Sequence, residues 1–249
     1  YKRQVHGEAG ALVPRAVHSM ACENAVTPGE KCHRMLFEHG TPSRRSPEAS
    51  PDEELKKEGR PMEHPHIPLE DLQVQVAACR RCPLCDGRTQ TVFGVGNPNA
   101  RVLIVGEAPG KNEDLQGEPF VGAAGKYLNE LLAIAGLSRE DVYIANVLKC
   151  RPPSNRDPRP EEIQACTPFL REQTRTINPE YIVTLGNFST KFILKTDVGI
   201  TRLHGTLQRA GRFKVFPIFH PAAALYDSKK REALENDFAT LGELLRGEA

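Results

Sequence analysis

Four short apolar runs constrain the fold of this sequence more than any other feature. They are continuous rather than alternating, and they lie at 102–105, 142–147, 181–185 and 215–219. Such runs are typical of strands buried on both faces of a parallel sheet. Helical patterns follow the successive runs, at 124–135, 160–176, 189–194 and 229–245. This alternation predicts an α/β fold, a three-layer sandwich with a central four-stranded parallel sheet.

Residues 1–66 differ in composition from the rest of the chain. They are rich in Pro, Gly, Ser, Glu and Arg, and they show no sustained apolar periodicity. We expect a largely disordered extension there, with the packed domain at 67–249. No role is assigned to the extension or to its Cys22 and Cys32.

Charge and hydropathy exclude some classes of protein. No apolar run approaches the roughly 18–20 residues that span a bilayer, and no signal-peptide pattern is present. We therefore expect a cytoplasmic protein with reduced thiols and no membrane partner. We also expect it to be a monomer. The formal net charge is only +1, so any surface that binds nucleic acid must be local.

Polar residues stand where the predicted strands end. Glu107 follows Gly106 after the first run, Asn146 is in the second, and His220 follows the fourth. Ligands of open α/β sheets bind at the carboxyl ends of the strands. We therefore expect these side chains to share one crevice.

The cysteines predict a metal site. Cys79 and Cys82 form a C-x2-C pair, with Cys85 nearby and Cys150 and Cys166 far downstream. Four thiolates suit either zinc or an iron–sulfur cluster, and the spacing does not separate the two. A redox dithiol is less favoured because no predicted strand precedes Cys79. Ordinary buried thiols are the remaining alternative for the downstream pair.

Several further motifs occur in a fixed order along the chain. They are Phe93-Gly94-Val95-Gly96-Asn97-Pro98, Gly106-Glu107-Ala108-Pro109-Gly110, Glu118-Pro119-Phe120-Val121-Gly122, Tyr143-Ile144-Ala145-Asn146, Lys149-Cys150-Arg151-Pro152-Pro153 and His220-Pro221-Ala222-Ala223-Ala224-Leu225. Together with the C-x2-C pair, they resemble the family 4, iron–sulfur uracil-DNA glycosylases. The resemblance runs from about residue 72 to 245. It implies the glycosylase fold and an enzyme that flips uracil out of DNA and hydrolyses its N-glycosidic bond, which starts base excision repair.

The resemblance also implies a cofactor and a location. The family's structural [4Fe–4S] cluster has ligands that match Cys79, Cys82, Cys150 and Cys166, which leaves Cys85 as the spare thiol. Uracil-containing DNA is the expected partner, and a DNA repair enzyme of the cytoplasm is expected to associate with the nucleoid.

Roles for the pocket residues follow from the chemistry, because uracil leaves as an anion that needs a positioned donor. His220 is the candidate donor to uracil O2, unless it is only a structural cap. Asn146 matches the O4 and N3–H edge of uracil, and Phe120 is a candidate for stacking on the base. Gly106 and Ala108 would let the backbone approach the base closely.

Other residues are candidates for positioning the attacking water and for contacting the DNA. Ala108 stands where other glycosylase families carry an Asp, so Glu107 and Glu113 are the candidates to place the water. Glu113 is alternatively a block to the methyl group of thymine. Leu225 is predicted to be the wedge that fills the gap left by the flipped base, unless it packs beneath its loop.

Two other functions are weighed against turnover. The first is a uracil-DNA binding protein of the same superfamily, whose relatives carry a His in an inserted basic loop. The stretch 150–166 has no His, which favours an enzyme. The second is a zinc-stabilised nucleotide-binding module, which the lack of a P-loop signature weakens.

Overall fold

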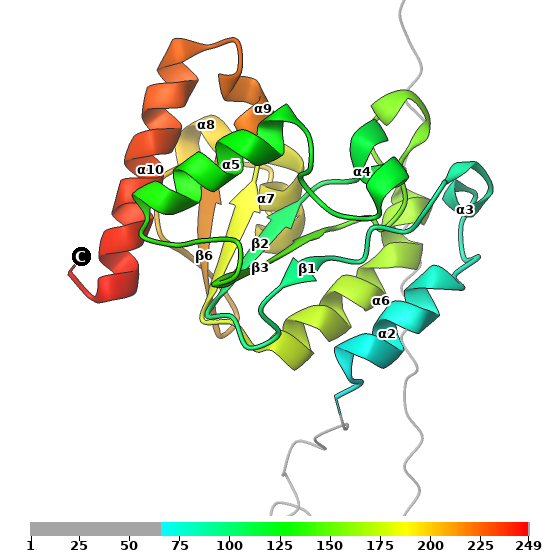
Figure 1. The fold of residues 1–249 in the computed structure, drawn as a ribbon. Coiled ribbons are helices and arrows are strands. Elements are labelled where there is room, and N and C mark those ends of the chain that lie inside the picture. The colour runs from blue at the N-terminus through cyan, green and yellow to red at the C-terminus, as the bar shows by residue number, and fades with distance from the viewer. Residues whose placement is uncertain (1–65, 249) are drawn as a thin grey trace, which may run out of the picture. The chain divides into compact units, whose positions relative to one another are not determined.

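A six-stranded sheet forms the centre of the molecule (Figure 1). The computed structural model describes residues 66–248, so the predicted extension 1–66 lies almost wholly outside the described residues. The strand order is β1-β3-β2-β4-β6-β5. The strands are β1 (Val95–Gly96), β2 (Val102–Gly106), β3 (Val142–Asn146), β4 (Tyr181–Leu185), β5 (Gln208–Ala210) and β6 (Phe213–Ile218).

The predicted four-stranded parallel sheet is confirmed, and the structure adds one antiparallel strand at each of its edges. The four apolar runs are β2, β3, β4 and β6, and these strands pair in parallel. The sequence did not predict β1 and β5, which pair antiparallel to β3 and β6. Both strands are too short, at two and three residues, to give a periodic signal.

Helices cover both faces of the sheet, as the three-layer prediction requires. The core on one face contains residues of α2 (Leu69–Ala77), α6 (Pro160–Ile177) and α7 (Asn187–Leu194). The core on the other face contains residues of α5 (Ala123–Ile134) and α10 (Ser228–Arg246). Shorter helices occupy the connections, and they are α3 (Leu84–Gly87), α4 (Lys111–Gln116), η1 (Pro153–Asn155), α8 (Ile200–Leu203) and α9 (Pro221–Ala224).

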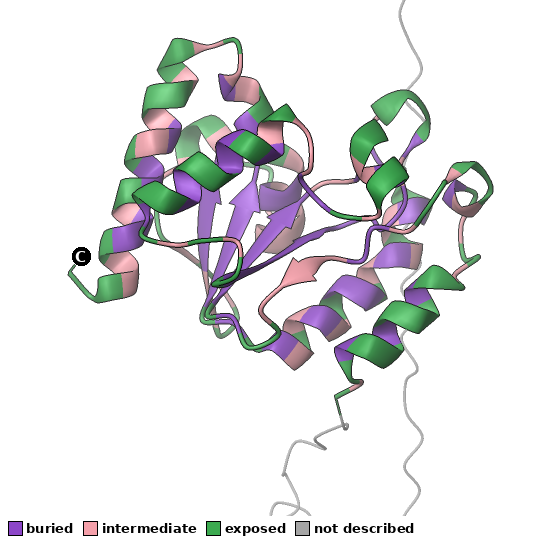
Figure 2. Ribbon diagram, viewed as in Figure 1, coloured by how far each residue is buried: buried purple, intermediate pink, exposed green. Residues whose placement is uncertain are grey.

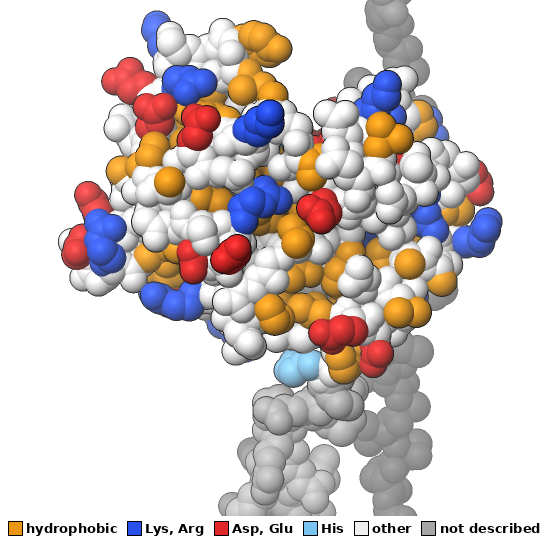
Figure 3. All heavy atoms as spheres, viewed as in Figure 1, with side chains coloured by type: hydrophobic (Ala, Val, Ile, Leu, Met, Phe, Trp, Pro, Cys, Tyr) orange, Lys and Arg blue, Asp and Glu red, His pale blue; other side chains and the backbone are white. Residues whose placement is uncertain are grey.

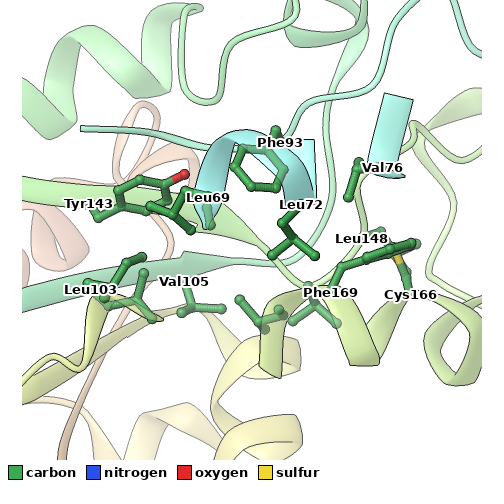
Figure 4. Close-up of a cluster of buried hydrophobic side chains, with 14 of the residues drawn as sticks. Leu69, Leu72, Val76, Phe93, Leu103, Val105, Tyr143, Leu148, Cys166 and Phe169 are labelled. Carbon is green, nitrogen blue, oxygen red and sulfur yellow. The ribbon is translucent and has the colours of Figure 1, made fainter. Parts of the chain in front are cut away.

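Successive residues of a strand belong to the cores on opposite faces of the sheet. In β2, Leu103 and Val105 join the core beneath α2 and α6, whereas Val102 and Ile104 join the core beneath α5. Figure 4 shows side chains of α2 packed over the first of these cores. The central strands are buried along their length (Figure 2). Burial on two faces is the reason that the apolar runs are continuous.

None of the helices within 66–248 is long and apolar enough to cross a membrane.

Candidate functional site

A pocket of about 400 Å³ lies beyond the carboxyl ends of β2 and β3. It brings together segments that the sequence predicted to meet there. The lining residues are Glu107, Ala108, Pro109, Gly110, Glu113, Phe120, Ala124, Asn146, Pro152, Asn155, Arg156, His220 and Ala222. In Figure 1, this is the end of the sheet near α4 and α9.

Asn146 stands beside Gly106 because their strands pair in register. The side chain of Asn146 is buried, and its Oδ1 atom has no hydrogen-bond partner within the described residues. A Cβ atom at Gly106 would stand 2.3 Å from this oxygen, so only glycine fits there. A buried acceptor left unsatisfied costs about 1–3 kcal/mol, and a ligand with an N–H group would remove that cost.

His220 begins α9 just after β6 ends. Its Nδ1 atom accepts a hydrogen bond of 3.2 Å from the backbone N–H of Ala222. Nδ1 is therefore unprotonated, and the ring proton of the neutral imidazole is on Nε2. Loss of surrounding water lowers the pKa of His220 to about 4, although the nearby charge of Glu113 acts in the opposite direction. At neutral pH the residue is an uncharged hydrogen-bond donor.

Phe120 is held in an unusual backbone conformation at the pocket wall. Its φ angle is 55°, in the left-handed region that non-glycine residues seldom adopt. Its ring centroid lies 5.6 Å from that of His220, with 28° between the planes. Gly125 makes this possible, since a Cβ atom there would stand 1.6 Å from the Phe120 carbonyl oxygen.

Two charged side chains fix the loop that carries Phe120. The Oε1 atom of Glu113 accepts from the backbone N–H groups of Val121 and Gly122, at 3.1 and 3.3 Å. Arg139 donates to the carbonyl oxygens of Pro119 and Phe120, at 2.8 and 3.4 Å. Glu113 thus borders the pocket while one of its oxygens holds the loop, a use that the sequence did not predict.

Glu107 lies where two clefts meet. It lines the pocket and also a neighbouring cleft of about 690 Å³, and His220 lines both. Burial raises the pKa of Glu107, and the negative charge of Asp157 raises it further. Asp114 is buried nearby in the sequence, and its Oδ1 atom accepts from the backbone N–H of Thr89 at 3.0 Å.

An ion pair holds the segment between Cys150 and Cys166. Arg156 donates to the buried Glu162 carboxylate through both terminal nitrogens, at 2.5 and 2.9 Å. The sequence did not predict this partner for Arg156. The fold instead ties it to the first turn of α6, where Glu162 also accepts from the backbone N–H of Arg159.

The four predicted cluster cysteines surround one small cavity, and Cys85 lines it as well. Burial raises the pKa of the Cys166 thiol to about 11, and it also raises those of Cys82 and Cys150. Two sulfurs accept hydrogen bonds. Arg88 donates to Cys150 Sγ at 3.4 Å, and the backbone N–H of Lys149 donates to Cys166 Sγ at 3.2 Å.

The same cavity gives no ready-made site for a single ion. Between residues 66 and 248, no three His, Cys, Asp or Glu side chains form a group that could hold a metal ion.

Lys149 joins the cysteine cavity to the pocket, a link that the sequence did not predict. The side chain is buried, and its Nζ atom donates to the backbone carbonyl of Asn146 at 2.8 Å. Burial lowers the pKa of Lys149 to about 8. A Lys one position before a predicted metal ligand is the only signal that the sequence offered.

The predicted wedge residue lies outside the lining of the pocket. Leu225 is half-buried and packs against the core beneath α10. On the face viewed in Figure 3, basic and acidic side chains are interspersed.

Comparisons with known proteins show the superfamily to which the chain belongs. The model of the uracil DNA glycosylase superfamily matches residues 93–241, more than half of the chain. A type-4 uracil-DNA glycosylase from Archaeoglobus fulgidus is 50% identical over 184 residues, which cover 71% of this chain and 92% of the relative. One from Thermotoga maritima is 48% identical, over 63% of this chain and 83% of the relative. A type-5 uracil-DNA glycosylase from Pyrobaculum aerophilum is 31% identical, over 61% of this chain and 82% of the relative.

Proposed function

This chain belongs to the uracil-DNA glycosylase superfamily, among relatives of type 4, and from that premise we propose how its pocket removes uracil from DNA. The protein is an enzyme of the glycosidase class, a hydrolase of N-glycosyl bonds. The names of the relatives favour turnover over binding alone and over a zinc-stabilised nucleotide-binding module. The reaction that we assign is release of uracil by water, the first step of base excision repair.

The unsatisfied oxygen of Asn146 is the observation that carries the proposal. Uracil presents an N–H donor at N3, whereas cytosine presents an unprotonated ring nitrogen there. Oδ1 of Asn146 can accept from uracil N3–H, and the amide nitrogen can donate to O4. With cytosine, both groups would meet a partner of the same kind, so the pocket discriminates by hydrogen bonding.

His220 and Phe120 act on the same base. As the bond from N1 to C1′ breaks, negative charge develops on uracil, and Nε2–H of neutral His220 donates to O2. A neutral donor stabilises this anion without the need to ionise inside the pocket. The ring of Phe120 stacks on the flipped base, and Gly106 and Ala108 leave room for close backbone approach.

The water has two carboxylate candidates, and the structure favours one. Glu113 already holds two backbone amides through one oxygen, whereas Glu107 borders both clefts. We assign placement of the water to Glu107. Glu113 then supports Phe120 and limits the space around the base, which suits the alternative role against the methyl of thymine.

The proposed cofactor is a [4Fe–4S] cluster held by Cys79, Cys82, Cys150 and Cys166. The donor chemistry fits, because thiols from three separate segments line one cavity and two of the sulfurs receive N–H hydrogen bonds. When bound, the cluster supplies a thiolate-held structural crosslink and takes no part in cleavage. Two of its proposed ligands bracket the segment that brings Arg156 to the pocket.

The DNA-facing wedge, the monomeric state, the nucleoid association and the domain limits stay predictions. The wedge candidate, Leu225, has a half-buried side chain that packs against the core.

A direct assay tests the function. Purified protein is incubated with single-stranded oligonucleotides that differ only in one base, uracil, thymine or cytosine, and then treated with alkali. We expect strand breakage at uracil alone. Intact uracil strands at an enzyme excess would contradict the proposal, and a His220→Ala variant controls for contaminating glycosylase.

A further inference from the structure

Tyr226 is the most exposed of the large apolar side chains in residues 66–248. Its exposed fraction is 96%, whereas the other exposed large apolar side chains in residues 66–248 range from 39% to 69%. Its neighbour Leu225, by contrast, is half-buried against the core. Leaving an aromatic ring in water forgoes the stabilisation of burial, so such a ring is a candidate for contact with a partner.

The turn that presents Tyr226 is anchored on both sides. On one side, His220 caps α9, and Leu225 ends it. On the other, the Asp227 carboxylate accepts from the backbone N–H groups of Lys229 and Lys230 and so caps α10. The ring is therefore held out on a short turn between two fixed points. Little conformational entropy would be lost when it binds.

The position of this turn relates it to the pocket. Ala222 lines the pocket and lies one turn of helix before Tyr226. The turn joins α9 to α10, at the end of the sheet where the pocket opens (Figure 1). An aromatic group at that rim is placed to meet the bases next to one that has entered the pocket.

Charge beside the ring favours nucleic acid over an apolar partner. Lys229 is exposed in the first turn of α10. Lys230 is paired with Asp227 at 3.3 Å. Lys229 therefore adds an exposed positive charge three residues from the ring. An aromatic ring near a cation is the combination that stacks on bases while contacting the phosphate backbone.

We propose that Tyr226 is the side chain that enters the DNA duplex and stacks in the gap left by the flipped uracil, with Leu225 supporting the turn from beneath. The inference rests on the proposed glycosylase function. It concerns only double-stranded DNA, because a single strand has no paired stack to hold open.

Single-turnover cleavage distinguishes a side chain that inserts into the duplex from one that only supports the turn. Tyr226→Ala is compared with the wild type on one uracil strand, used alone and annealed to its complement. Base–aromatic stacking predicts a loss of roughly 5- to 150-fold on the duplex and little change on the single strand. Tyr226→Phe should retain the duplex rate, since the ring and not the hydroxyl group does the stacking. Leu207→Ala, at another exposed apolar position, should leave both rates unchanged.

A binding measurement gives a second readout. Affinity is measured for a duplex whose 2′-fluoro uracil nucleotide resists cleavage, and Tyr226→Ala should weaken it by a similar factor. Equal rates of Tyr226→Ala and wild type on the duplex would overturn the proposal, as would a duplex-selective loss in Leu225→Ala alone. Cleavage of the single strand by the wild type would leave the glycosylase function standing in either case.

Discussion

Asn146 and His220 each bring to the pocket a polar side-chain atom that can bind the base. For Asn146 the atom is Oδ1, and for His220 it is Nε2, because Nδ1 is occupied by the amide of Ala222. Both atoms are fixed before substrate arrives. Preorganised groups of this kind stabilise developing charge without reorganising during the reaction.

Removal of the His220 side chain should affect the rate and not the fold. We expect His220→Ala to lower single-turnover cleavage of uracil by about 10²–10³-fold, the usual loss for one positioned donor. Thermal unfolding and iron content should match those of the wild type. Wild-type cleavage by this variant would show that His220 is a structural cap.

The pH dependence should come from Glu107 rather than from His220. Since the pKa of His220 is lowered to about 4, the ring is neutral from pH 5 upward, and the rate should show no step near the ordinary histidine value of about 6.5. Glu107 is charged only above its raised pKa, so the rate should fall with acid at a pH above 4.5. Glu107→Gln should lower the rate and remove that acidic limb. A wild-type step near 6.5 would contradict the assignment for His220.

Asn146 should govern which base is accepted. Asn146→Asp replaces the amide donor with an acceptor, so cleavage of uracil should fall, and weak cleavage of cytosine becomes possible if the pocket still closes. Matched uracil and cytosine oligonucleotides test this in single-turnover reactions. Unchanged discrimination together with an unchanged uracil rate would place base recognition elsewhere.

At the scale of elements, the segment from Cys150 to α6 links the cysteine cavity to the pocket. Its two ends supply proposed cluster ligands, and Pro152, Asn155 and Arg156 between them line the pocket. The Arg156–Glu162 pair holds this segment to the start of α6. The position of Arg156 in the pocket therefore depends on Glu162, which does not itself line the pocket.

Loss of this pair should be measurable as stability. Hydrogen bonds from Arg156 lower the pKa of Glu162, so the pair stabilises the fold above the ordinary Glu value and fails as pH drops through the lowered one. We expect Glu162→Gln to reduce the free energy of unfolding by about 1–3 kcal/mol at neutral pH. Urea denaturation measures it, and Glu161→Gln, one residue away and exposed, is the matched control. Equal effects of the two variants would show that the ion pair contributes nothing.

At the scale of the whole molecule, the cysteine cavity joins parts of the chain that are distant in sequence. It connects the turn after α2, the segment after β3 and the middle of α6. A bound cluster would crosslink these parts, and its binding free energy would add to the stability of the fold.

Cluster ligands and the spare thiol should respond differently to substitution. Anaerobically purified protein should contain about four irons per chain. Cys79→Ala should lose iron and unfold at a lower temperature, whereas Cys85→Ala should retain iron even though Cys85 lines the same cavity. Stoichiometric zinc without iron, or equal iron loss from both variants, would contradict the proposed ligands.

Much of the architecture follows from the sequence alone. Continuous apolar runs identified the four central strands, because a strand that is buried on both faces has no polar side. The positions of Asn146 and His220 at strand ends then placed them in one pocket, since parallel strands present their carboxyl ends at one edge of the sheet.

Only the tertiary structure decided how each polar group is used. Apolar periodicity reports whether a residue is buried, and it does not identify the partner that a carboxylate or a guanidinium finds across space. Glu113 holding the Phe120 loop, Glu162 binding Arg156 and Lys149 reaching Asn146 all depend on such partners. The same reason separates Leu225 from Tyr226, because adjacent residues in a turn can face the core or the solvent, and only packing decides which.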